Sequence, residues 1–350
     1  MSINYNTLDS EELREKAREV LHSLRKYQIP NTKKAIIQIL NSFLPFLILW
    51  TLMYHLWDVS ILAVIGLGIL NAFFLVRIFI IQHDCGHRSF IKNNAWRNVI
   101  GYLCSLVSFI PYSWWAKSHH FHHGHNGMLE VRDIGDINTL TVEEYRVLSP
   151  FKKFMYRVYR SPLVMFVLGP IYYVFIHNRL PLIDLPEFKK EKLGLYISNV
   201  VLISIIVGLC FLFDWQRVLL TQGLVLAFFA VVAIWFFYIQ HQHEEGYKHW
   251  KKNWDYMTAA IKGSSYYKLP KIMNWFTGNI AIHHIHHLNP SIPNYNLMKC
   301  VKENPWFDNY TSVITFWESL KMIHHRLWDE SQQRMISFRE YGRMRKLGLV

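Results

Sequence analysis

Four long apolar segments constrain the fold of this 350-residue chain more than any other feature. They cover residues 36–57, 59–81, 195–213 and 218–239, and the only charged residue among them is Arg77. Each is long enough for a helix to cross a hydrocarbon layer of about 30 Å. Four such runs are rare in soluble proteins, so four buried soluble helices are the weaker alternative. The sequence therefore predicts an all-α integral membrane protein with four transmembrane helices. We expect Arg77 to extend toward the lipid head groups.

The positions of lysine and arginine predict the orientation of these spans. The links at Asp58 and at 214–217 are very short and carry little positive charge. Almost all other Lys and Arg residues lie before, between or after the resulting two hairpins. The positive-inside rule then places both termini and the middle region in the cytoplasm. We therefore attribute the net charge of +13 to the cytoplasmic placement of Lys and Arg and to contact with anionic lipid head groups. We do not interpret it as a sign of nucleic-acid binding.

The rest of the chain is expected to lie on the cytoplasmic side. Residues 1–35 form a polar N-terminal segment with an amphipathic helix at about 7–27 and no cleavable signal peptide. The apolar stretches 99–112 and 163–177 are short for spans and are predicted to be interfacial helices. The membrane domain is expected to cover 36–310, and 311–350 to form a cytosolic helical tail.

Thirteen of the 19 histidines fall in four clusters. The clusters are HDCGH (His83, His87), HHFHHGH (His119, His120, His122, His123, His125), HQH (His241, His243) and HHIHH (His283, His284, His286, His287). The first and third of these follow the ends of the spans 59–81 and 218–239 within two residues. By the predicted topology, all four clusters lie on one side of the membrane.

The spacing within the clusters is typical of metal ligands on helices. His83 and His87 are four residues apart, and His119, His122 and His123 have the spacing i, i+3, i+4. Residues at these spacings share one helical face. A neutral imidazole is the usual nitrogen ligand for zinc, copper, iron or nickel. The predicted ligands are His83, His87, His119, His122, His123, His241, His283, His286 and His287.

Nine ligands are too many for one metal ion and suit two. A structural zinc needs four ligands and a catalytic zinc three, whereas imidazole-rich sites with open positions fit iron better. The residue types alone leave the metal open, and surface histidines that trap metal by accident are the weaker alternative. Three neighbours are candidate partners of the ligands or proton carriers: His120, His243 and His284. The four cysteines form no Cys-x-x-Cys pair and are expected to be reduced thiols.

These motifs resemble those of the membrane fatty acid desaturases. That family has a first box His-Asp followed by two or three residues and His, and two boxes His-x-x-His-His. Here they read HDCGH, HHFHH and HHIHH, in surroundings such as FYIQHQHEEGY and HHIHHLNPSIPNYNL that resemble the acyl-lipid Δ12 and ω-type branch. The resemblance covers about residues 35–310. One departure is Phe237, which stands where the acyl-CoA branch has an Asn before the position of His241.

The resemblance implies an oxygen-dependent desaturase with two iron ions. Such an enzyme introduces a cis double bond into a membrane-lipid acyl chain, with O₂ as co-substrate. The chain has no His-Pro haem signature and no iron–sulfur cysteine set, so the resemblance implies a separate electron donor such as a ferredoxin or cytochrome. We expect Asp84, between two ligands, to orient an imidazole by a hydrogen bond, with a helix cap or salt bridge as the alternative.

The same histidine boxes serve related reactions. A di-iron lipid hydroxylase or carotenoid oxygenase is the first alternative, because the boxes do not encode where oxygen goes. A non-enzymatic membrane metal-binding protein is the second, although transporter ligands are expected within the spans.

Overall fold

The computed structural model describes residues 10–350, so residues 7–9 of the predicted N-terminal helix lie outside the described part. The helix α1 (Ser10–Leu24) is followed by the short helix η2 (Arg25–Tyr27). Apolar residues recur every three to four positions along α1 and form one face of the helix. On this face Leu13, Ala17 and Leu24 are fully buried. These side chains share a core with Ile261 and Leu297, so α1 packs on the C-terminal part of the chain.

Within the described residues 10–350, four helices are each long and apolar enough to cross a membrane, as the sequence predicts. They are α2 (Thr32–Leu56), α3 (Ile61–Gly86), α9 (Lys189–Leu212, preceded by η6, Pro186–Phe188) and α10 (Trp215–His241). At about 1.5 Å per residue, a helix of 26 residues such as α3 spans about 39 Å and exceeds the hydrocarbon layer. The ends of α3 and α10 therefore carry His83 and His241 beyond the apolar stretches.

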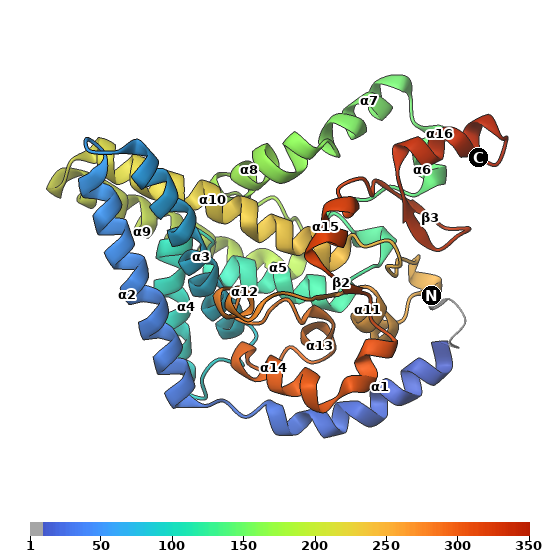
Figure 1. The fold of residues 1–350 in the computed structure, drawn as a ribbon, viewed down its shortest axis with the longest axis horizontal. Helices are drawn as coiled ribbons and strands as arrows, with labels where there is room; N and C mark the ends of the chain where they lie inside the picture. The colour runs from blue at the N-terminus through green and yellow to red at the C-terminus, as the bar shows by residue number, and fades with distance from the viewer. Residues whose placement is uncertain (1–9) are drawn as a thin grey trace.

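The two hairpins meet at their turns and diverge toward the histidine-bearing ends, as the upper left of Figure 1 shows. Trp57 Nε1 donates to Thr221 Oγ1 (2.8 Å), and the backbone N–H of Asp214 donates to the Tyr54 hydroxyl (3.1 Å). Arg217 also forms an ion pair with Asp58. These polar contacts join the turn of α2 and α3 to the turn of α9 and α10.

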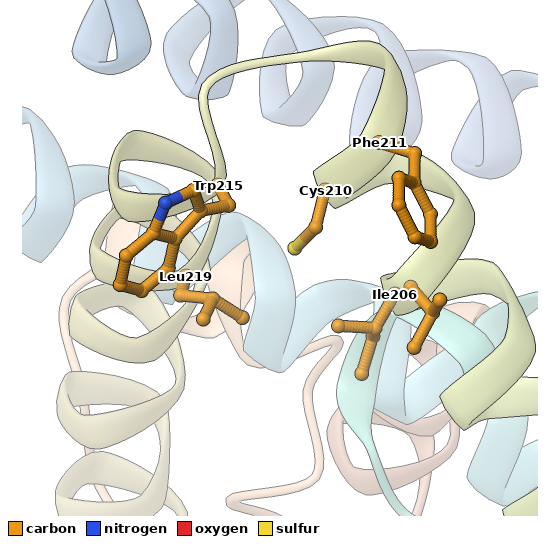
Figure 2. Close-up of a pocket in the computed structure, with 6 residues that line it drawn as sticks. Ile206, Cys210, Phe211, Trp215 and Leu219 are labelled. Atoms are coloured by element: carbon orange, nitrogen blue, oxygen red, sulfur yellow. The ribbon is translucent and has the colours of Figure 1, made fainter.

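An apolar hollow of about 470 Å³ lies between α9 and α10 close to their turn. Figure 2 shows Ile206 and Cys210 of α9 on one side and Trp215 and Leu219 of α10 on the other. Because α10 has 27 residues, its two ends are about 40 Å apart. The hollow is thus remote from His241 at the other end of α10, and it carries no metal-ligating cluster.

Each of the two short apolar stretches belongs to a bent helix pair. The helix α4 (Asn94–Ser108) starts five residues before the predicted 99, and it meets α5 (Tyr112–His125) at 97°. Phe109 has the left-handed φ of 58°, and Pro111 follows it, which together end α4. The second pair, bent by 53°, joins α7 (Pro150–Tyr159) to η4 (Val164–Leu168), α8 (Gly169–Phe175) and η5 (His177–Arg179). Either pair is long and apolar enough to be one bent span, so interfacial placement stays a prediction.

The remaining elements form a cap at the histidine-bearing ends of the hairpins (Figure 1). The short helices are η3 (Leu129–Val131), α6 (Val142–Val147), η7 (Lys251–Asn253), α11 (Tyr256–Lys262), α12 (Lys271–Phe276), α13 (His283–Leu288), α14 (Asn294–Glu303), η8 (Pro305–Asn309), α15 (Phe316–Met322) and α16 (Phe338–Lys346). Two small sheets complete the cap: β1 (Tyr266–Tyr267) pairs parallel with β2 (Val313–Ile314), and β3 (Leu327–Asp329) antiparallel with β4 (Arg334–Ile336).

The predicted helical tail, 311–350, is therefore wrong in part, because it contains β2, β3 and β4. Local turn chemistry explains the hairpin of β3 and β4. The carboxylate of Asp329 accepts the N–H groups of Ser331 (2.9 Å) and Gln332 (3.2 Å), and Gln333 has the left-handed φ of 50°. These contacts reverse the chain where a helix would continue.

The expectation that Arg77 extends to the head groups is also wrong. Arg77 is buried, its guanidinium donates to the carbonyl of Trp275, and it lies 4.0 Å from the centre of the Trp275 ring. The neighbouring Phe276 contacts Phe73 and Phe74 of α3. The helix α12 therefore packs on a transmembrane helix, and it covers Arg77 before that side chain reaches the lipid.

Candidate metal centre

Four elements bring the histidine clusters to one place. His83 lies in the last turn of α3 and His87 directly follows that helix, and α5 carries the second cluster. The end of α10 carries His241, and the six-residue helix α13 carries the HHIHH cluster. All nine predicted ligands lie within two adjacent groups of imidazoles.

The first group contains five of the predicted ligands, whose nitrogen atoms all lie within 4.8 Å of one another. Its members are His83, His87, His119, His123 and His286. The Nε2 atom of His123 is 3.1 Å from that of His119 and 3.0 Å from that of His286. The Nε2 atoms of His83 and His87 are buried and have no hydrogen-bond partner. A buried orphaned nitrogen is costly, and a metal ion would satisfy both.

The second group contains His122, His241 and His287, again within 4.8 Å of one another. His283 stands beside these three residues, because its Nε2 lies 3.0 Å from that of His241 and 3.1 Å from that of His287. The Nε2 atoms of His122 and His241 are 3.2 Å apart. We therefore count His283 with this group, which then has four imidazoles.

Helical spacing decides which group each histidine joins. Residues four apart point the same way, so His119 and His123 share the first group, and His283 and His287 share the second. The sequence neighbours His122 and His123 point to different groups. The rings of His123 and His287 stack 4.1 Å apart and connect the two groups.

The distances and the burial both fit metal coordination. With a metal–nitrogen distance of about 2.1 Å, ligands at right angles are about 3.0 Å apart and tetrahedral ligands about 3.4 Å apart. The observed separations between neighbouring Nε2 atoms run from 3.0 to 3.2 Å and are closer to the first value. Burial lowers the pKa of His283, His286 and His287 well below that of a free imidazole. These side chains are neutral at pH 7, as a metal ligand must be.

Asp84 contacts His83, one of the predicted ligands. Its Oδ1 accepts the Nδ1–H of His83 at 3.0 Å, which leaves Nε2 of His83 directed at the first group. Its Oδ2 accepts the backbone N–H (2.6 Å) and the side-chain amide (2.8 Å) of Asn294 at the start of α14. A carboxylate that holds a ligand imidazole in this way fixes its tautomer and ring orientation.

Asn294 is a site residue that the sequence interpretation missed. It connects α3 to α14, and its carbonyl accepts the side-chain amide of Asn279 (3.1 Å) from the loop before α13. The only local signal was its place in LNPSIPNYNL, directly after Pro293, where a helix is expected to start. The partner of its side chain lies 210 residues away, at Asp84.

The other three candidates join neither group. His120 is exposed on α5. His243 is buried and its Nε2 lies 3.0 Å from the carbonyl oxygen of Lys262, while His284 is buried between the rings of Phe307 and Tyr266. Burial lowers the pKa of His243 to about 4 and that of His284 to about 3. Their roles as proton carriers stay predictions.

Buried charges surround the second group. Arg160 is fully buried and donates a hydrogen bond to Gln242 Oε1 (3.0 Å). Gln242 directly follows His241, a member of the second group. Lys248 and Asp136, both nearly buried, face each other at 4.0 Å. Arg160 and Lys248 are a further pair that the sequence interpretation did not single out, because their burial depends on contacts between α7 and the loop after α10.

The fold and this site define a class: helical proteins with membrane-spanning helices that hold two adjacent groups of histidines at one end. Residues 59–319 match the family called Fatty acid desaturase. The chain belongs to this family.

Individual relatives agree with this assignment. The chain is 40% identical to a protein named Fatty acid desaturase from Bacillus subtilis, over 93% of this chain and 91% of that protein. It is 25% identical to the sn-1 oleoyl-lipid 12-desaturase of a Picosynechococcus species, over 76% and 77% of the two chains. It is 24% identical to the chloroplastic sn-2 acyl-lipid omega-3 desaturase (ferredoxin) of Helianthus annuus, over 64% and 52%.

Proposed function

We propose that this protein is an oxygen-dependent acyl-lipid desaturase that introduces a cis double bond at a histidine-ligated di-iron centre. The observation that carries the proposal is the convergence of nine imidazoles into two adjacent groups at the ends of transmembrane helices. Family membership supports the reaction class, since desaturation is an oxidation. The names of the relatives from Picosynechococcus and Helianthus support a lipid-bound acyl substrate.

The ligand sets support iron over zinc. The five imidazoles of the first group exceed the three or four ligands that zinc takes in proteins, and the four of the second exceed the three of a catalytic zinc. Neighbouring nitrogens near 3 Å fit a six-coordinate ion, which would keep one open position in the first group and two in the second. Open positions are a requirement of oxygen chemistry at non-haem iron.

The protein supplies the ligands and the setting for this chemistry. Bound iron would activate O₂, which with two electrons and two protons takes two hydrogens from adjacent methylenes and is reduced to two molecules of water. Asp84 holds His83 in the tautomer whose Nε2 is free to bind metal. All four histidines of α13 are buried, which would keep bulk water away from the centre during the reaction.

The proposed orientation places the histidines and both termini in the cytoplasm. The positive-inside rule supports it, because the turns at Asp58 and at 214–217 carry few of the 38 Lys and Arg residues. The acyl chain would then come from the bilayer and the electrons from a separate cytosolic donor. The Helianthus relative is named as a ferredoxin enzyme, and we propose a ferredoxin or a cytochrome here.

Lipid analysis in a host that lacks polyunsaturated lipids tests the reaction. Cells that express the chain with a competent donor should accumulate a new double bond, located by mass spectrometry of the acyl chains. A hydroxylated lipid or an oxidised carotenoid without a new double bond would favour the related di-iron oxygenases instead. About two zinc ions and no iron per purified chain would contradict every oxidative function and favour a metal-binding protein.

A further inference from the structure

The helix α7 has an apolar face that no other part of the described chain covers. Phe151, Phe154, Met155 and Val158 lie on one side of it and are 71%, 60%, 48% and 39% exposed. Their spacing of three and four residues places them on a single helical face. Tyr156 occupies the opposite face and is buried against Tyr145 and Phe338. The helix α7 is thus apolar on both sides, and one side is open.

Cationic side chains border this open face. Lys152 and Arg157 are exposed on α7, which contains no acidic residue. The adjacent α16 carries four more exposed cations: Arg339, Arg343, Arg345 and Lys346. The acidic residues of α6 and α16 each have an arginine partner: Glu143 pairs with Arg146, Glu144 with Arg132 and Glu340 with Arg334. The surface formed by α7 and α16 therefore carries excess positive charge.

The apolar face continues toward the transmembrane helices. After α7, the exposed side chains of Leu163, Leu168 and Tyr172 extend it along η4 and α8. Phe166 of η4 packs on Trp235 and Tyr238 of α10. Figure 1 shows α7 and α8 as one arm that runs from α10 toward α16. The open face of α7 is continuous with a helix that crosses the membrane.

We propose that α7 lies in the plane of the membrane surface and that the cations of α7 and α16 bind anionic lipid head groups. A helix with large apolar side chains on one face and lysine or arginine at its borders is the form that interfacial helices take. Each such cation near an anionic surface adds electrostatic attraction to the apolar contact. A soluble acidic partner would match the charge but not the four large apolar side chains. This inference depends on the membrane spans and not on the proposed reaction.

The inner face of α7 connects this surface to the candidate metal centre. The Tyr156 hydroxyl donates to the carbonyl of Arg326 (2.7 Å), and Arg160, just after α7, donates to Gln242. Gln242 follows His241 of the second histidine group. Binding of α7 to the membrane would therefore hold the β3–β4 hairpin and α16 in place beside that group.

Spin labels on the full-length protein in nanodiscs test the proposal. A label is attached to Phe154→Cys, and in a second protein to Gln332→Cys in the exposed turn of the β3–β4 hairpin, each with Cys210→Ser because the other three native cysteines are buried. The discs contain phosphatidylcholine alone or mixed with phosphatidylglycerol. The label at 154 should be reached by oxygen more than by a water-soluble nickel chelate, and more so in anionic discs. The label at 332 should show the reverse preference.

Charge reversal provides the matched comparison. Lys152→Glu with Arg157→Glu should reduce the immersion of the label at 154 in anionic discs, whereas Lys251→Glu with Lys252→Glu should not. Because Arg157 also donates to the Tyr145 hydroxyl, Lys152→Glu alone serves as a milder variant, with unchanged metal content as the check on folding. Equal access of the chelate to labels 154 and 332 in both lipids would overturn the proposal. The proposal would also be overturned if the charge reversal weakened the binding of an acidic electron donor but left the immersion of the label at 154 unchanged.

Discussion

At the scale of single residues, the direction of each side chain on the short helix α13 decides whether a histidine joins the candidate metal groups. His283, His284, His286 and His287 are all buried. His286 joins the first group, His283 and His287 belong to the second, and His284 faces Phe307 instead. A metal site therefore depends on which face of the helix an imidazole occupies, and burial by itself does not identify a ligand.

The pair His286→Ala and His284→Ala tests this distinction. Loss of His286 removes one of five ligands and should lower the metal content by about one ion, with loss of desaturation. Loss of His284 should keep two ions per chain, because its ring contacts only the surrounding core. Elemental analysis of the purified variants and lipid profiling measure both effects. Full metal content in His286→Ala would remove this residue from the ligand set.

The contact of Asp84 with His83 and Asn294 leads to a second prediction at this scale. Asp84→Ala leaves Nδ1 of His83 without an acceptor and should weaken metal binding about 10- to 100-fold. Asn294→Ala removes one of two donors to Oδ2 and should have a smaller effect in the same direction. Titration of the metal-free protein with Co²⁺, followed by its visible absorption, gives the affinities.

A helix cap far from the metal groups provides the control for these variants. Asn93 caps α4 by accepting the N–H of Trp96 at 3.1 Å. Asn93→Ala should cost about 1 kcal/mol of stability and leave Co²⁺ affinity unchanged. Equal Co²⁺ affinities for all three variants and the wild type would contradict an orienting role of Asp84.

At the scale of elements, the loop between α12 and α13 fixes the position of the third histidine cluster. Gly278 and Asn279 have left-handed φ values of 54° and 59°. A Cβ at Gly278 would lie 2.7 Å from Ile80 Cγ2 of α3. Together with the contact of Arg77 with Trp275, this close approach holds the loop directly on α3. The packing of α12 on α3 thus sets where α13 begins.

Gly278→Ala should therefore destabilise the protein and disturb metal binding. The left-handed backbone costs about 1–2 kcal/mol for alanine, and the contact with Ile80 adds to this cost. Gly66→Ala in α3 is the control, because a Cβ there meets nothing within 4 Å and should be neutral or stabilise by about 0.5–1 kcal/mol. Thermal unfolding in detergent compares the two. A midpoint for Gly278→Ala at or above that of Gly66→Ala would refute the role of this loop.

At the scale of the whole molecule, the metal centre joins parts of the chain that are remote in sequence. Its predicted ligands come from α3, α5, α10, α13 and the residue after α3, so both hairpins and the cap contribute. The polar contacts at the far turns hold the opposite ends of the hairpins together. The helices α3 and α10 are therefore fixed at one end by their turns and at the other by their histidines.

Metal binding should accordingly stabilise the entire fold. A ligand that binds only the native state raises the free energy of unfolding by about 2.7 kcal/mol at a hundredfold excess over its Kd. Anaerobic addition of Fe²⁺ to the metal-free protein should raise its unfolding temperature, and a chelator should reverse the rise. The His286→Ala variant should show a smaller rise in unfolding temperature than the unaltered protein. The His120→Ala variant, which alters an exposed side chain, should show the same rise as the unaltered protein. No shift with Fe²⁺ in the unaltered protein would contradict the proposed centre.

The sequence by itself determined the four helices long enough to span a membrane, and it predicted the nine histidines that the structure brings together. Long apolar runs and histidine spacings of three and four residues are properties of short stretches of sequence, so local patterns are enough to predict them. Only the tertiary structure decided how the ligands divide between two groups, that Asn294 contacts Asp84, and that α12 covers Arg77. These features join residues up to 210 positions apart. They depend on how helices pack in space, which no local periodicity encodes.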